Sequence, residues 1–87
     1  MENIKRLIDA GSSISGAIKE VLSQKGLSIS AFAKKHERNP NNMINAIAGT
    51  RAPSPGDVEA LISELGGTDI EWRELLHEAG RPVERAS

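Results

Sequence analysis

The sequence predicts an all-α fold, a compact bundle of about five short helices. Apolar residues recur at the three- and four-residue spacing of a helix face, and no segment alternates apolar with polar residues as a half-buried strand does. Glycine, proline and typical N-cap residues divide the chain into short pieces. Helices shorter than about 12–15 residues are marginal alone in water, so their apolar stripes must pack against one another.

The first part of the chain predicts one helix behind a short leading segment. Residues 1–12 are expected to be an N-terminal arm or a short helix that carries Ile4, Leu7 and Ile8. A longer helix follows and ends at Gly26, since glycine accepts the left-handed backbone of a helix end. Its cap is Ser12 or Ser13, and its stripe is Ile14, Ala17, Ile18, Val21 and Leu22.

Two shorter helices come next, close together in the chain. Ser28 can cap the first, and Asn39 followed by Pro40 begins the second. The Asn side-chain oxygen can accept a hydrogen bond from an unpaired backbone N–H of the first turn, and proline has no backbone N–H that would need a partner there. Gly49 ends the second helix. Their apolar residues are Ile29, Phe32 and Ala33 in the first, and Met43, Ile44, Ala46 and Ile47 in the second.

The last part predicts a fourth and a fifth helix, which complete a single domain over residues 13–80. Ser54 with Pro55 begins the fourth, and Thr68 with Glu71 forms a capping box for the fifth. The fourth ends at Gly66–Gly67, the fifth ends at Gly80 and Pro82, and the tail 81–87 is expected to be frayed. The stripes are Val58, Leu61, Ile62 and Leu65, then Trp72, Leu75, Leu76 and Ala79.

Length and composition exclude several classes of protein. The 87 residues make one small domain, and the 11 basic residues nearly balance the 12 acidic ones. The absence of cysteine excludes disulfides, zinc–thiolate sites and cysteine nucleophiles, and it favours a reducing compartment such as the cytoplasm. No apolar run approaches the ~20 residues of a membrane span, and the N-terminus does not have the pattern of a secretory signal.

Charge is distributed unevenly along the chain. Residues 25–51 carry five basic residues against Glu37 alone, while residues 52–87 carry three arginines against eight acids. A basic middle beside an acidic end suggests one face that meets a polyanion. The alternative is a scatter of solvated charges, and the acids of residues 57–84 are expected to lie on the surface.

An asparagine cluster marks the third helix as the candidate functional element. The cluster consists of Asn39, Asn41, Asn42 and Asn45, and such a density is unusual because Asn has a low helix propensity. Two short helices joined by a few residues form a helix-turn-helix, and an outward amide can hydrogen-bond the N6/N7 edge of adenine in a major groove. The competing interpretation is a polar solvent face with turn chemistry at its start.

This segment resembles the XRE-type helix-turn-helix family of phage repressors and Cro proteins. The resemblance is carried by residues 27–35, with the run Leu-Ser-Ile-Ser-Ala-Phe-Ala-Lys-Lys, and by residues 39–54, which end in Gly-Thr-Arg-Ala-Pro-Ser. Two departures stand in the turn: Glu37 occupies a position where the family favours glycine, and Arg38 one that is usually apolar. They predict a less tight turn.

The resemblance implies a lambda-repressor-like domain whose recognition helix spans about Asn39–Ala48. Asn41, Asn45 and Asn42 would then contact bases. The residues implied to contact the DNA backbone are Ser28, Lys34, Lys35, Arg38, Asn39, Thr50 and Arg51. The implied function is a sequence-specific, double-stranded DNA-binding transcriptional regulator, a repressor of phage or prophage type that acts by occluding a promoter.

One recognition helix contacts few bases, so a homodimer on a palindromic operator is expected. Its seam would be the fifth helix, through Trp72, Leu75, Leu76 and Ala79, or the N-terminal segment; the other interpretation of these four residues is core. The alternative function is a protein-interaction module on the same fold, an antitoxin-like partner or an adaptor. No metal is expected, because His36 and His77 have no partners at ligand spacing. No enzyme activity or cofactor is expected either, because short helices offer little concave pocket and no Ser–His–acid order suggests a nucleophile.

Overall fold

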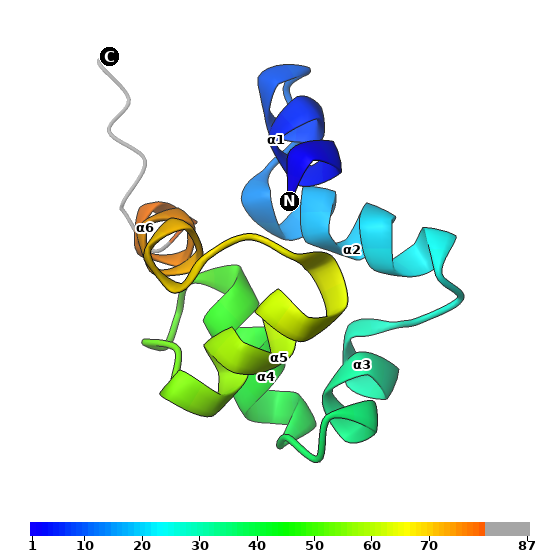
Figure 1. Cartoon of the computed structure of the whole chain (residues 1–87), viewed down its shortest axis with the longest axis vertical. Coiled ribbons are helices and arrows are strands. Elements are labelled where there is room, and N and C mark those ends of the chain that lie inside the picture. Colours follow the sequence, from blue (N-terminus) through cyan, green and yellow to red (C-terminus); the bar gives the residue numbers. More distant parts are fainter. Residues whose placement is uncertain (80–87) are drawn as a thin grey trace.

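The computed structural model describes residues 1–79, and all regular structure in this part of the chain is helical (Figure 1). The predicted all-α class is therefore confirmed, with the N-terminal segment forming a helix of its own. The helices are α1 Glu2–Asp9, α2 Ile14–Gln24, α3 Ile29–Lys35, α4 Pro40–Ala48, α5 Pro55–Leu65 and α6 Asp69–Ala79. The predicted stop at Gly80 and Pro82 and the tail 81–87 lie outside the described residues.

Side-chain caps fix the beginnings of the five helices from α2 to α6. In each case the side-chain oxygen of the residue before the helix accepts the backbone N–H three residues further on. These pairs are Ser13–Gly16, Ser28–Ala31, Asn39–Asn42, Ser54–Asp57 and Thr68–Glu71, at 2.9–3.3 Å. Each start agrees with the sequence-based prediction, and Ser13 rather than Ser12 caps α2.

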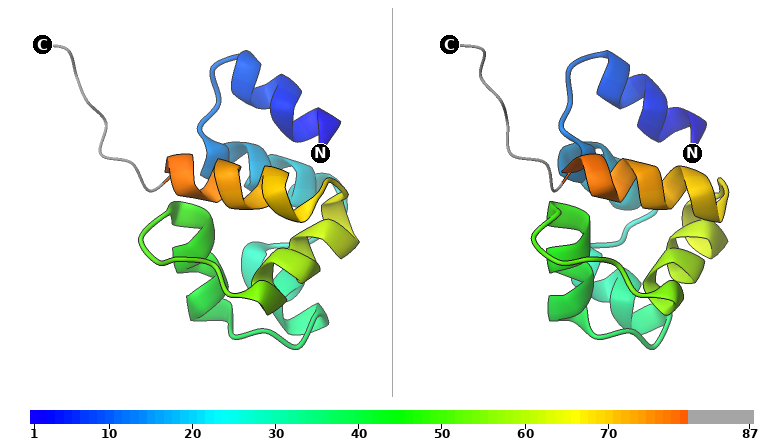
Figure 2. Two further views of the ribbon diagram at one scale, coloured as in Figure 1. Left: turned by 60° about the vertical axis from the view of Figure 1, so that its left-hand side comes forward. Right: turned by 90° about the vertical axis from the view of Figure 1, so that its left-hand side faces the viewer.

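Two helices cross the middle of the molecule and the others pack around them. Figure 2 shows α1 on one side of α2 and α6, with α3, α4 and α5 on the other side. Helix α2 contacts α1, α3, α4 and α6, while α3 packs mainly on α4. This arrangement brings the α3–α4 pair to one end of the molecule, away from α1.

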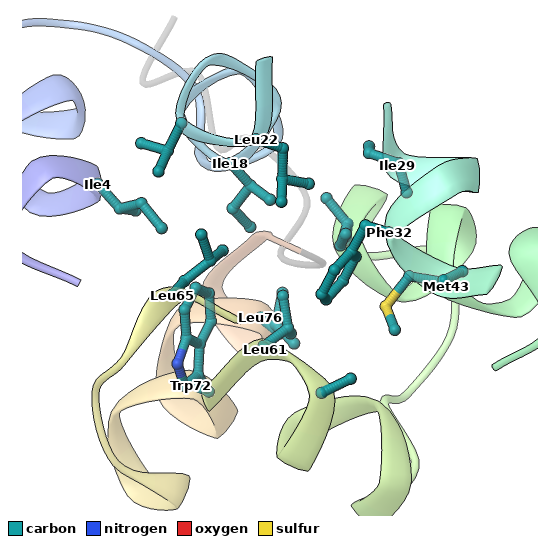
Figure 3. Packing of buried hydrophobic residues seen from close by; sticks show 14 of the residues in the cluster. Ile4, Ile18, Leu22, Ile29, Phe32, Met43, Leu61, Leu65, Trp72 and Leu76 are labelled. Atoms are coloured by element: carbon teal, nitrogen blue, oxygen red, sulfur yellow. The ribbon is translucent and has the colours of Figure 1, made fainter. Parts of the chain in front are cut away.

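The core is aliphatic around two aromatic side chains. Figure 3 shows Ile18 and Leu22 from α2 converging with Phe32 of α3 and Trp72 of α6. Ile4 of α1 is also completely buried, so the N-terminal segment belongs to the fold and is not a loose arm. Burial of these stripes is the main stabilising term for such short helices.

Two of the four residues predicted for a dimer seam on α6, the fifth helix of the sequence analysis, lie in the core. Trp72 is 0% exposed and Leu76 is 2% exposed, and the indole N–H of Trp72 donates a 2.7 Å hydrogen bond to the carbonyl of Gly66. Leu75 and Ala79 are half-buried. The seam interpretation is therefore wrong for Trp72 and Leu76, because these side chains are already enclosed within one copy of the chain.

Within residues 1–79, no helix is long and apolar enough to cross a lipid bilayer.

Candidate nucleic-acid interface

A tight turn at residues 36–39 joins α3 to α4. The N–H of Glu37 donates to the carbonyl of Lys34 at 3.0 Å, and the N–H of Arg38 donates to the carbonyl of Ala33 at 2.7 Å. This is the Schellman arrangement of a helix end, in which the residue that donates the first of these bonds has a left-handed backbone. Glu37 supplies it, with φ of 56°. The predicted loosening of the turn is wrong, because the glutamate adopts the backbone that glycine usually provides.

The outward face of α4 is an uncharged stripe. Its exposed residues are Asn41, Ile44, Asn45 and Ala48, at the spacing i, i+3, i+4 and i+7. Met43, Ala46 and Ile47 are completely buried against the rest of the fold, which fixes the rotation of the helix. We call these four exposed residues the amide stripe, since two of them carry amides.

The remaining two asparagines lie at the start of α4, and one of them caps the helix. The Asn39 side-chain oxygen accepts the Asn42 N–H at 3.1 Å and so caps the helix. Asn39 is exposed, while Asn42 is half-buried at the flank of the amide stripe. Asn41 and Asn45 are therefore the two predicted base-contacting residues that face solvent most directly.

Besides Asn39, four predicted backbone-contacting residues are exposed and make no ion pair with any described residue. Ser28 caps α3, and the Thr50 hydroxyl donates to the carbonyl of Asn45 at 3.2 Å. Lys34 on α3 and Arg51 after α4 make no ion pair with any described residue. Both positive charges are thus available to an anionic partner at this end of the molecule.

Arg38, in contrast, is bonded to the start of α5. Its Nε donates to the Asp57 carboxylate at 2.9 Å, and its Nη2 donates to the Ser54 hydroxyl at 2.8 Å. Asp57 is 1% exposed, and its carboxylate also accepts the backbone N–H of Ser54. The Arg38 guanidinium therefore compensates the buried charge of Asp57. The resemblance implies a different role for Arg38, a contact with a DNA phosphate.

Lys35 is likewise paired, in a cluster around Glu64 of α5. Lys25 and Lys35 each bring a Nζ to 2.8 Å from the Glu64 carboxylate, and Nε2 of His36 lies 3.0 Å from it. The Glu64 side chain is only 7% exposed. Hydrogen bonds from Lys25, then Lys35 and His36, lower the pKa of Glu64 to about 2.

These pairs revise two expectations from the charge pattern. Three of the five cations in residues 25–51 form ion pairs with two carboxylates of α5, so the basic segment does not form one continuous face of unpaired cations. The expectation that the acids of residues 57–84 lie on the surface is wrong for Asp57 and Glu64. Both are enclosed because they meet cations from the α2–α4 region.

An open groove of about 590 Å³ runs beside the amide stripe. Ile44 forms one wall, and Leu27 and Ile29 contribute apolar surface at the start of α3. Lys19 and Ser23 of α2 bring polar groups to it. Ile44 was grouped with the apolar residues of α4 from the sequence, and the structure leaves it exposed beside the buried face.

No family model, no curated protein and no solved structure matches this chain. Among the described residues there is also no group of histidine and acidic side chains that could hold a metal ion.

Proposed function

We propose that the protein binds double-stranded DNA with α4 in the major groove. The observation that carries the proposal is the amide stripe, in which Asn41 and Asn45 project from a helix whose opposite face is anchored in the core. An asparagine amide both donates and accepts, as the adenine N6/N7 edge requires. A rigid helix holds the two amides at fixed spacing, which is needed to read a sequence.

Backbone contacts would come from both ends of the stripe. Lys34 and Arg51 offer charge to phosphates, and the capped start of α4 adds the positive end of its helix dipole. Ser28, Asn39 and Thr50 are exposed polar groups in the same region. These contacts would position α4 without reporting sequence.

In this proposal the protein is a transcriptional regulator that represses by occluding a promoter, and it binds a palindromic operator as a homodimer. Each well-placed amide–adenine pair discriminates by only about 1–3 kcal/mol, so one copy of α4 gives little specificity. Two copies on two half-sites would multiply it. Sizing of the protein, free and on a palindromic duplex, tests the dimer; a strict monomer in both states would exclude it.

The test of DNA binding is selection of bound sites from a random duplex pool at low salt, followed by titration of the selected duplex. We expect affinity to fall steeply with salt, because bound phosphates release counterions. Arg51→Ala should weaken binding to all sequences and reduce the salt slope by about 1. Asn41→Ala and Asn45→Ala should instead relax the preference at individual base pairs.

Matched controls exist on α1, at the other side of the molecule. Asn3 and Arg6 are exposed there, so Asn3→Ala and Arg6→Ala remove the same chemical groups without touching α4. Both should bind as the unaltered protein does. Equal losses on every sequence for the Asn41 and Asn45 variants would contradict base recognition, and no binding to any duplex at low salt would exclude the function.

One observation favours the alternative, a protein-interaction module. Lys25, Lys35 and Arg38 are ion-paired with Glu64 and Asp57 within the fold, and the chain as a whole has a net charge of −1. Dedicated DNA-binding domains are usually more basic. Absence of duplex binding, together with a stable complex with another protein, would select this alternative.

A further inference from the structure

We propose that Ile44 contacts the 5-methyl group of thymine, so that the amide stripe selects A·T base pairs. The inference rests on the proposed function and adds a specificity-determining residue to it. It follows from the order of side chains along the exposed face of α4: amide at 41, branched aliphatic at 44, amide at 45, methyl at 48.

The exposure of Ile44 is the first observation. This side chain is 39% exposed, whereas the three buried residues of α4 are completely enclosed. Ile44 and Ile70 are the two large apolar side chains exposed among the described residues. On α4, Ile44 stands three residues after Asn41 and directly before Asn45, so it lies within the surface that would face the bases.

The absence of charge from the stripe is the second observation. None of Asn41, Ile44, Asn45 and Ala48 carries the guanidinium or ammonium that makes the commonest specific contact with guanine O6 and N7. Amides match adenine, and apolar groups match the thymine methyl, which is the one apolar group on the major-groove edge. Both kinds of side chain therefore point to the same base pair.

The groove beside Ile44 supplies the space for such a contact. The groove has a volume of about 590 Å³ and lies beside Ile44, and Leu27 and Ile29 extend its apolar surface. A methyl group that approaches Ile44 from this side would be transferred from water into contact with apolar side chains. Transfer of one methyl-sized group corresponds to about a four-fold change in affinity.

The experiment replaces thymine by deoxyuridine, one position at a time, in the duplex selected from the random pool. Deoxyuridine keeps the base pair and its hydrogen bonds and removes only the methyl group. We expect a selected half-site of consecutive A·T pairs, and at one position or more a loss of about four-fold on methyl removal. Ile44→Ala should bind the two duplexes equally at that position, and Ile44→Val should retain part of the difference.

Ile70→Ala is the matched control, because Ile70 is 71% exposed on α6 and outside the stripe. It should keep the full preference for thymine. The inference is overturned if thymine and deoxyuridine duplexes bind equally at every position, if Ile44→Ala keeps the preference, or if selection returns G·C pairs opposite the stripe. Each of these results leaves DNA binding itself intact, whereas the absence of any duplex binding excludes the function as well.

Discussion

The two sides of the α3–α4 pair are built from different chemistry. On the side that faces α5, Lys35 and Arg38 meet Glu64 and Asp57 in ion pairs of 2.8–2.9 Å, and Lys25 at the end of α2 also pairs with Glu64. On the opposite side, α4 presents an uncharged stripe of two amides and two apolar side chains. The cations thus attach the pair to the fold, and the neutral groups remain at the surface.

This difference indicates that one side of the pair holds α3 and α4 in place and that the other side selects the ligand. Ion pairs between neighbouring elements fix how α3 and α4 lie against α5, while the exposed stripe carries the groups that distinguish one ligand from another. If the division is correct, variants on the α5 side change stability, and variants on the outward side change binding with little effect on stability.

The largest stability effect is expected for Arg38→Ala. Removal of the guanidinium leaves Asp57, which is 1% exposed, without its cationic partner. Breaking a buried pair from one side is strongly destabilising, and since Arg38 is itself partly exposed we expect a loss of about 2–3 kcal/mol. Urea denaturation followed by circular dichroism measures it.

Arg51→Ala is the control, because Arg51 is exposed and makes no ion pair with a described residue. Its free energy of unfolding should stay within about 0.5 kcal/mol of the unaltered protein. Equal stability losses for the two arginine variants would remove the distinction between the sides.

A smaller effect is expected for Glu64→Gln, of about 1–2 kcal/mol at neutral pH, since two of the three partners of this carboxylate are exposed lysines. The Glu64 pKa lies at about 2, below its ordinary value of 4.5. A carboxylate with a lowered pKa stabilises the fold above its ordinary pKa, and this contribution is lost as the pH falls from 4.5 to about 2.

The pH dependence distinguishes Glu64 from other acids. Stability of the unaltered protein should decrease over that acid range, and Glu64→Gln should decrease less. Glu59→Gln provides the control, because Glu59 lies exposed on the same helix. If both variants keep the acid dependence of the unaltered protein, the cluster around Glu64 does not contribute to it.

The local structure of this protein follows closely from its sequence. Caps, glycine stops and three- or four-residue apolar spacing are properties of neighbouring residues, so they located α2 to α5 and the start of α6. The same rules indicated which face of α4 is buried, because Met43 and Ile47 share one side of the helix.

The partners of charged residues could not be predicted in this way. Arg38 and Asp57 are separated by 19 positions in the chain, and Lys25 and Glu64 by 39. Their pairing depends on how α5 packs against the α3–α4 turn, which no local pattern encodes. The charge count per segment was therefore correct, but it overestimated how many of the cations have no ion-pair partner within the fold.

The smallest effect is expected at Glu37, where the two sides meet. A non-glycine residue with φ of 56° costs about 1 kcal/mol relative to glycine, although glycine also has more freedom to lose on folding. Glu37→Gly should therefore raise the free energy of unfolding by about 0.5 kcal/mol. Thermal and urea denaturation at neutral pH measure the change.

Glu37→Ala separates backbone strain from charge, because alanine removes the carboxylate and keeps the Cβ atom. Only the glycine variant should be more stable, whereas both should bind duplex DNA slightly more tightly, since each removes an acid next to the start of α4. A stability gain shared by the two variants would trace the cost at this turn to the charge of Glu37. The left-handed backbone would then be set by the Schellman hydrogen bonds at little expense, and glycine would offer this turn no advantage.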